Sequence, residues 1–114
     1  MPIQLVWGNG TPQDSGSVIN IIAAHRQATR TVKRLNAEWM SADEAEALLL
    51  RRPLDVALMK ETELRRRLVR AQVRNASDVK IKADYFRRLM GQEWYEIEPG
   101  EVRELLRSFA TIKI

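Results

Sequence analysis

The sequence has 114 residues, a formal net charge of +4 and no cysteine. A chain of this length suits one domain. The absence of cysteine excludes a disulfide framework, a thiolate metal site and a cysteine nucleophile. The first residues lack the basic and apolar regions of a signal peptide, and no apolar run reaches the length of a membrane span. We therefore expect a cytoplasmic protein without a membrane partner.

Positive charge is concentrated in the middle of the sequence. Residues 51–90 contain twelve Lys and Arg against five Asp and Glu, whereas residues 1–50 contain four against five and residues 91–114 contain three against five. A basic middle between slightly acidic ends indicates a helical surface that faces an anion, either nucleic acid or an acidic protein partner.

The first sixteen residues predict a strand followed by a loop. Ile3–Trp7 alternates apolar and polar side chains, and the glycines and proline of residues 8–16 end the strand. A glycine-bearing loop before a helix is the setting of a phosphate site. Here Gln13 stands where the third glycine of such a motif belongs, so we do not expect a nucleotide cofactor.

Residues 18–40 carry apolar side chains at alternating spacings of three and four, which predicts a helix of about six turns. Ser17 is one of three candidate N-caps for it. His25, the only histidine, lies on the apolar stripe. We expect a buried, hydrogen-bonded imidazole there, because no second histidine can share a metal and no nucleophile motif accompanies it.

Ser41 and Glu44 have the spacing of a capping box, which predicts a short helix over residues 42–51. Pro53 then ends this helix and suits the first turn of another. The short helix would connect the two long ones.

Residues 54–90 contain neither proline nor glycine, and their apolar stripe is interrupted at Glu61 and Asn75. This segment is either one helix about 55 Å long or two helices that part at Asn75–Asp78. In the second case Ser77 can cap the new helix, because short polar side chains there compete for the backbone.

Gly91 follows the last apolar position and predicts the helix end. Trp94–Ile97 predicts a short strand or extended arm, Pro99 begins a final helix, and residues 111–114 predict an edge strand. The fold we expect is mainly α, in a single domain over residues 1–114. A long helical hairpin pairs 18–40 with 54–90, joined by the short connecting helix, with a C-terminal helix and minor β structure at the two ends.

The apolar stripe is longer than the short helices can cover, which predicts a coiled-coil-like homo-oligomer. The residues expected at the oligomer interface are Leu64, Leu68, Ala71, Val79 and Phe86.

The arginines are the strongest functional signal. Arg66, Arg70 and Arg74 recur at spacings of four and are expected to line one face of the helix, and the guanidinium fork suits phosphate. The residues expected to bind nucleic acid are Arg66, Arg67, Arg70, Arg74, Lys80, Lys82, Arg87 and Arg88. The alternative is a solvated face, partly neutralised by acidic neighbours, or a surface for an acidic protein.

Five glutamates between residues 93 and 104 form the main acidic cluster. They straddle a predicted turn, so we expect helix-dipole complementation there and no metal site. No pair of nucleophile and base is visible elsewhere, and we expect no enzyme activity and no cofactor.

Residues 64–102 resemble the central region of phage small terminase subunits. The resemblance rests on Leu68-Val69-Arg70-Ala71-Gln72, on Lys80 and Lys82, on Gly91, on the extended stretch through Ile97 and on Pro99-Gly100-Glu101-Val102. It implies a helical, ring- or multimer-forming protein that recognises DNA beside an ATP-driven large subunit during genome packaging. The family's N-terminal helix-turn-helix has no counterpart in residues 1–50, so no DNA-contact residue follows from the resemblance.

Two functional hypotheses result. The first is a non-enzymatic, oligomeric nucleic-acid-binding accessory protein of phage DNA packaging or assembly, located in the host cytoplasm or the virion. The second is a structural adaptor, or a subunit of a virion or other complex, which binds proteins through its helices without nucleic acid.

Overall fold

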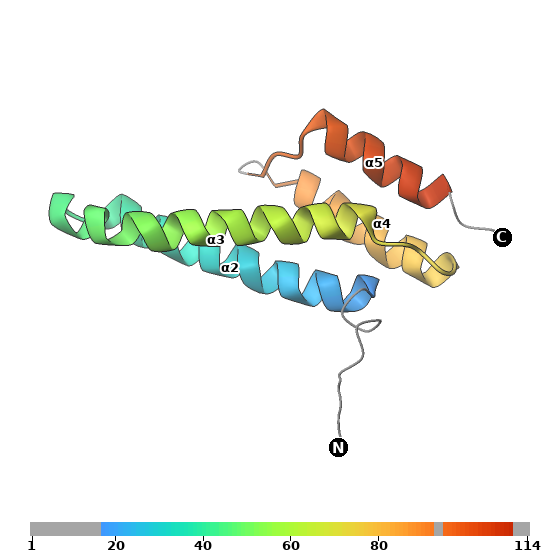
Figure 1. Cartoon of the computed structure of the whole chain (residues 1–114), viewed down its shortest axis with the longest axis horizontal. Coiled ribbons are helices and arrows are strands. Elements are labelled where there is room, and N and C mark those ends of the chain that lie inside the picture. Colours follow the sequence, from blue (N-terminus) through green and yellow to red (C-terminus); the bar gives the residue numbers. More distant parts are fainter. Residues whose placement is uncertain (1–16, 93–94, 111–114) are drawn as a thin grey trace, which may run out of the picture. The chain divides into compact units, whose positions relative to one another are not determined.

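The computed structural model describes residues 17–92 and 95–110, and their regular structure is entirely helical (Figure 1). The helices are α2 (Val18–Ser41), α3 (Glu44–Arg70), α4 (Ala76–Met90) and α5 (Pro99–Ala110). The mainly α prediction is confirmed. The described part of the expected strand near residues 94–97 is not a strand, and the strands expected at 3–7 and 111–114 lie outside the described residues.

The chain divides into two compact units. The hairpin unit is Ala23–Arg66, in which α2 and α3 lie side by side (Figure 1). The terminal unit joins Met1–Ile22 to Arg67–Ile114. It contains the first residues of α2, the last residues of α3, and α4 and α5. Counted from the sequence, the hairpin unit has nine Lys and Arg against seven Asp and Glu, and the terminal unit has ten against eight. The net charge of the chain is therefore shared equally, at +2 for each unit, although most of the basic middle of the sequence belongs to the terminal unit.

Capping side chains define the starts of α2 and α3. The Ser17 hydroxyl accepts a hydrogen bond from the backbone N–H of Asn20 at 3.2 Å, which confirms Ser17 as the cap of α2. The carboxylate of Asp43 accepts from the N–H of Glu46 at 2.9 Å, and Glu46 reaches back to the N–H of Asp43 at 3.5 Å. The capping box is therefore Asp43–Glu46. The expected box two residues earlier is wrong, because Ser41 is the last residue of α2.

Pro53 lies inside α3 and does not end a helix. The separate connecting helix over 42–51 is therefore absent, and its residues form the first third of α3. Proline removes one backbone donor, which leaves the carbonyl of Leu49 without its helical partner. Leu49 is 79% exposed, so water can reach this part of the helix, and the loss of one bond does not break it.

The segment 54–90 is two helices. α3 ends at Arg70 and α4 begins after Asn75, whose extended backbone (φ −157°, ψ 176°) and side chain make it the N-cap. The Asn75 carbonyl oxygen accepts from the N–H of Asp78 at 2.8 Å, and the Asp78 carboxylate accepts from the N–H of Arg74 at 3.0 Å. The break comes slightly earlier than Asn75–Asp78, and Ser77 lies within α4.

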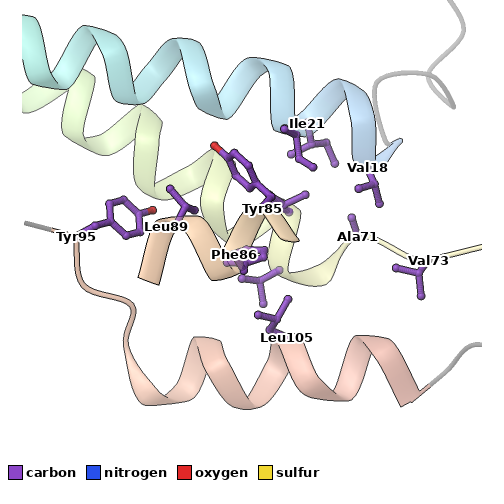
Figure 2. Packing of buried hydrophobic residues seen from close by; sticks show 12 residues of the cluster. Val18, Ile21, Ala71, Val73, Tyr85, Phe86, Leu89, Tyr95 and Leu105 are labelled. Carbon is purple, nitrogen blue, oxygen red and sulfur yellow. The ribbon is translucent and has the colours of Figure 1, made fainter. Parts of the chain in front are cut away.

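The terminal unit has a substantial apolar core. Figure 2 shows Phe86 on the side of α4 that faces α5 and Leu105, and Tyr85 on the side that faces α2. Phe86 is 1% exposed, and its ring meets that of Tyr85 edge to face at 6.2 Å between centroids. The buried members of this core are Val18, Ile21, Ile22, Leu68, Val69, Ala71, Val73, Tyr85, Phe86, Leu89, Tyr95 and Leu105.

The hairpin unit buries much less apolar surface. Its buried apolar residues are Ala28, Val32, Ala57 and Leu64, and none of them is aromatic. Three polar residues, His25, Glu61 and Arg65, are buried beside them. Two antiparallel helices cannot enclose a core on all sides, and this unit consists of little else.

Most of the residues expected at the oligomer interface are buried within one chain. Leu68 and Phe86 are 0% and 1% exposed, and both belong to the core of the terminal unit. Ala71 is also buried there and Val79 packs against the same core, while Leu64 is buried in the hairpin unit. Their apolar surface therefore does not require a second copy, and an interface between copies has to use other residues.

Candidate functional site

The basic residues are the starting point for a functional surface, because phosphate recognition depends on them. Those found exposed are Arg66, Arg67, Arg70, Arg74, Lys80, Arg87 and Arg88. Since α3 ends at Arg70, Arg74 lies in the connector to α4 and does not continue the helical row. Arg66 is the last residue of the hairpin unit, whereas the other six belong to the terminal unit.

Lys82 is the exception, and its assignment as a phosphate contact is wrong. Its side chain has 0% exposure. The ammonium Nζ donates hydrogen bonds to the carbonyls of Val69 at 3.0 Å and Ala71 at 2.8 Å, and to the Ser108 hydroxyl at 2.8 Å. It also lies 5.5 Å from the ring centroid of Phe109. Lys82 therefore has a structural role.

That role follows from the end of α3. The last carbonyls of a helix have no intrahelical partner and carry partial negative charge. Lys82 donates to one such acceptor, the carbonyl of Val69, and to the carbonyl of Ala71 just past the helix end, and it connects both to α5 through Ser108. Burial disfavours the charged ammonium and lowers the pKa of Lys82 from 10.5 to about 8. The hydrogen bonds offset part of this cost.

The exposed face of α4 is basic. The buried residues of this helix are Lys82, Tyr85, Phe86 and Leu89. Lys80 and Arg87 are seven residues apart and lie on the opposite face, because two helical turns bring a side chain back to the same side. Arg88 is exposed next to them. A short basic surface therefore runs along α4, and exposed Arg74 stands just before the helix.

Two ion pairs partly neutralise the surface of the terminal unit. Arg70 Nε lies 3.1 Å from Glu104 Oε2, and Arg87 Nε lies 3.9 Å from Asp84 Oδ1. Both pairs are solvent-exposed, and pairs of this kind contribute about 0–1 kcal/mol. A phosphate can therefore displace these carboxylates at small cost.

The hairpin unit contains a buried polar cluster that joins α2 to α3. His25 Nε2 lies 2.7 Å from Glu61 Oε2, and Arg65 Nη1 donates to both oxygens of Glu61, at 2.8 and 3.0 Å. The His25 side chain is 0% exposed and that of Glu61 is 9% exposed. The expectation of a buried, hydrogen-bonded histidine is confirmed. A histidine–carboxylate pair is a familiar catalytic unit, but the side chains of this pair are closed to solvent, and they join α2 to α3 within the hairpin unit.

The sequence contains a signal for this cluster in the polar residues that stand on the two apolar stripes. Glu61 interrupts the apolar stripe of α3, and His25 occupies the apolar stripe of α2. Two polar residues on facing stripes are expected to meet, because a buried polar group needs a partner.

Other candidate sites find little support in residues 17–92 and 95–110. No group of three His, Asp or Glu residues able to hold a metal ion occurs there, and none of the helices described is long and apolar enough to cross a membrane. The glycine loop of residues 8–16 lies outside the described residues, as do Trp7, Glu93 and Trp94. Comparison with protein-family models, with curated proteins and with solved structures finds no match for this chain.

Proposed function

We propose that this protein is a non-enzymatic, oligomeric nucleic-acid-binding accessory protein, and that the terminal unit binds the phosphate backbone. The observation that carries the proposal is the exposed basic face of α4, with Lys80, Arg87 and Arg88 opposite the buried side of that helix. The resemblance to phage small terminase subunits supports a place in DNA packaging or assembly, in the host cytoplasm or the virion.

The chemistry of this face suits a polyanion. Arginine offers a planar fork that bonds phosphate oxygens in a bidentate way, and lysine adds a mobile point charge. Two turns of helix separate Lys80 from Arg87, about 10 Å along the axis, so the two side chains reach different phosphates. Arg74, exposed just before α4, extends the basic surface beyond the helix.

Contacts of this type give affinity without sequence specificity. Each neutralised duplex phosphate releases counterions and steepens the salt dependence of log K by about 0.9. Phosphate contacts fix the position of the protein but do not read bases. We therefore expect duplex binding that depends strongly on salt and weakly on sequence.

The test replaces Arg74, Lys80 and Arg88 with glutamate together and measures duplex binding by fluorescence anisotropy over 50–300 mM salt. We expect at least tenfold weaker binding at the lowest salt and a salt slope smaller by about 2–3, since up to three phosphate contacts are lost. Arg70 and Arg87 are left unchanged because replacing them would also leave Glu104 and Asp84 without their partners.

A matched control makes the same charge change in the hairpin unit. Arg26, Arg30 and Lys33 are all exposed on α2, and the triple glutamate variant alters the net charge of the chain by the same amount. Binding lost equally in both variants would show a general effect of charge and contradict the assignment to α4. Unchanged binding in the Arg74, Lys80 and Arg88 variant would also contradict it.

The second candidate function is a structural adaptor that binds protein and not nucleic acid. It is favoured by the ion pairs of Arg70 and Arg87, which lower the anion affinity of the surface, and by the large exposed apolar side chains of the hairpin unit. This function predicts no duplex affinity at physiological salt, together with a stable complex with a protein partner.

A further inference from the structure

The outer face of α3 carries an unpartnered apolar stripe in the hairpin unit. Leu49, Val56 and Met59 are 79%, 55% and 72% exposed. The stripe continues through positions that are also exposed, in the order Ala45, Leu49, Arg52, Val56, Met59 and Glu63. The spacing is four, three, four, three, four, which is the heptad spacing of a helix that packs against another helix.

This stripe is not the face that packs on α2. The α3 residues buried in the hairpin are Ala57, Glu61, Leu64 and Arg65. At 100° per residue, Val56 and Met59 point well away from that buried side. Large apolar side chains in such a run on a soluble helix mark an interaction surface.

The spacing of the stripe is the same in both directions along α3. If two copies of α3 cross antiparallel about a twofold axis, Leu49 of one copy faces Met59 of the other, and Arg52 faces Val56. At the ends, Ala45 faces Glu63. Each contact then occurs twice, as a closed isologous dimer requires.

The charges beside the stripe are self-complementary in the same register. Asp55 lies next to Val56, so the Arg52 side chain of one copy reaches Asp55 of the other at the centre of the interface. Arg52 and Asp55 are both exposed in the single chain.

A groove next to the stripe adds apolar surface. It has a volume of about 680 Å³ and is lined by small residues of α2, including Ala24 and Ala28, and by Pro53, Val56 and Lys60 of α3. Small residues allow another helix to approach closely. A second hairpin seated on the stripe and this groove would form a four-helix arrangement.

We infer that the outer face of α3 is a homodimer interface in which two hairpins pair antiparallel through Leu49 and Met59, with Arg52 and Asp55 at the centre. The opposite charges of Arg52 and Asp55, which meet across the twofold axis in this register, favour a second copy over an unrelated amphipathic helix. The inference concerns the oligomeric part of the proposed function and does not rest on nucleic-acid binding.

The first test is the mass in solution, measured by size-exclusion chromatography with light scattering at about 50 μM chain. We expect a dimer for the native chain and a monomer for Leu49→Glu/Met59→Glu, with the helical circular dichroism retained. The control is Leu106→Glu, which introduces the same charge at an apolar residue of α5 that is 63% exposed; it should remain a dimer. A monomeric native chain, or a dimeric double variant, overturns the inference.

The second test uses charge reversal and does not depend on apolar residues. Arg52→Glu alone places four acidic groups at the centre of the dimer, and Asp55→Arg alone places four basic groups there, so each variant should be monomeric. Mixing the two variants pairs two acidic groups with two basic groups, and a heterodimer should form. Failure of the mixture to associate, when each variant is folded, overturns the inference.

The direction of pairing is tested by crosslinking, because the chain has no native cysteine. An equimolar mixture of Leu49→Cys and Met59→Cys chains should give disulfide-linked heterodimers, and Leu49→Cys alone should not crosslink. Crosslinking of Leu49→Cys with itself would indicate parallel helices and overturn the antiparallel register. None of the three assays includes nucleic acid, so failure of this interface and failure of duplex binding are distinguished.

Discussion

The terminal unit and the hairpin unit share two helices, α2 and α3, but differ in how much apolar surface they bury. The terminal unit has twelve buried apolar residues in one cluster, including Phe86, Tyr85 and Tyr95. In the hairpin unit four apolar residues are buried, together with the polar cluster of His25, Glu61 and Arg65.

The exposed apolar residues show the opposite distribution. Of the ten large hydrophobic residues exposed in the described chain, seven belong to the hairpin unit: Trp39, Met40, Leu48, Leu49, Val56, Leu58 and Met59. The remaining three are Ile19, Met90 and Leu106. A unit of two helices buries one side of each helix and leaves the others open. The comparison therefore indicates that the terminal unit buries its apolar core within one chain, whereas the hairpin unit leaves large apolar side chains exposed, which is the surface that the inferred homodimer would cover.

The largest loss of stability is expected from a cavity in the core of the terminal unit. Phe86→Ala removes a ring that is 1% exposed, and changes of this kind cost about 4 kcal/mol. The measurement is the free energy of unfolding in urea at a fixed chain concentration. Leu106→Ala is the control, since this residue is 63% exposed and should change stability by less than about 0.5 kcal/mol. Similar losses in the two variants would contradict a self-sufficient core.

Glu61→Ala tests what holds the hairpin unit together. It leaves His25 and Arg65 buried without their shared acceptor, and breaking a buried charged pair in this way costs about 3 kcal/mol. A double-mutant cycle with His25→Ala should give a coupling of at least about 1 kcal/mol, because the two side chains are in contact at 2.7 Å. The control is Glu63→Ala, at an exposed position two residues along α3. An equal loss at Glu63 would show that removal of any carboxylate from this part of α3 lowers stability, and would contradict a specific role of the buried cluster.

Lys82→Met tests the polar contact inside the terminal unit. The variant leaves the carbonyls of Val69 and Ala71 without a donor, and a loss of about 2 kcal/mol at pH 7 is expected. The folded pKa of Lys82 is about 8, below its ordinary 10.5. Between these values the unfolded chain binds the proton and the folded chain does not, so native stability rises with pH.

The difference between the native chain and Lys82→Met should therefore widen from pH 8 to pH 10.5, by at most about 1.4 kcal/mol per unit. Lys80→Met serves as the control because Lys80 is exposed on the same helix. A difference that is constant over this range would contradict the lowered pKa.

The helices themselves were predictable from spacing. The periodicity over 18–40 gives α2 to within a residue, and the proline at position 99 gives the start of α5. The failures lie where one local signal overrode another. A proline usually ends a helix, but α3 continues through Pro53 because the carbonyl that loses its partner, that of Leu49, is at an exposed position. The pairs Ser41/Glu44 and Asp43/Glu46 both have the three-residue spacing of a capping box, so the sequence alone does not distinguish between them.

The site was less predictable because burial depends on tertiary contacts. The positive charge of Lys82 suits a phosphate contact. However, Lys82 lies three residues before Tyr85 and four before Phe86, so it shares their buried face. Of the α4 residues expected on the apolar stripe, Phe86 is buried and Val79 packs against the core, but the other buried residues of this helix are Lys82, Tyr85 and Leu89. The exposed stripe of α3 was not expected, because the separate helix predicted over residues 42–51 would have divided it at Pro53.

The smallest effect concerns the break between α3 and α4, which assigns Ala71 and Val73 to the core of the terminal unit. Asn75→Ala removes the cap of α4 and should cost about 1 kcal/mol. Ser77→Ala should cost less than about 0.5 kcal/mol, because Ser77 is exposed inside the helix and a capping role there was the alternative. If the free energy of unfolding in urea fell more for Ser77→Ala than for Asn75→Ala, the result would indicate that α4 begins after Ser77 and that residues 71–75 belong to α3. In that case the connector would be helical, Arg74 would continue the row of Arg66 and Arg70, and the basic surface would belong to α3 instead of α4.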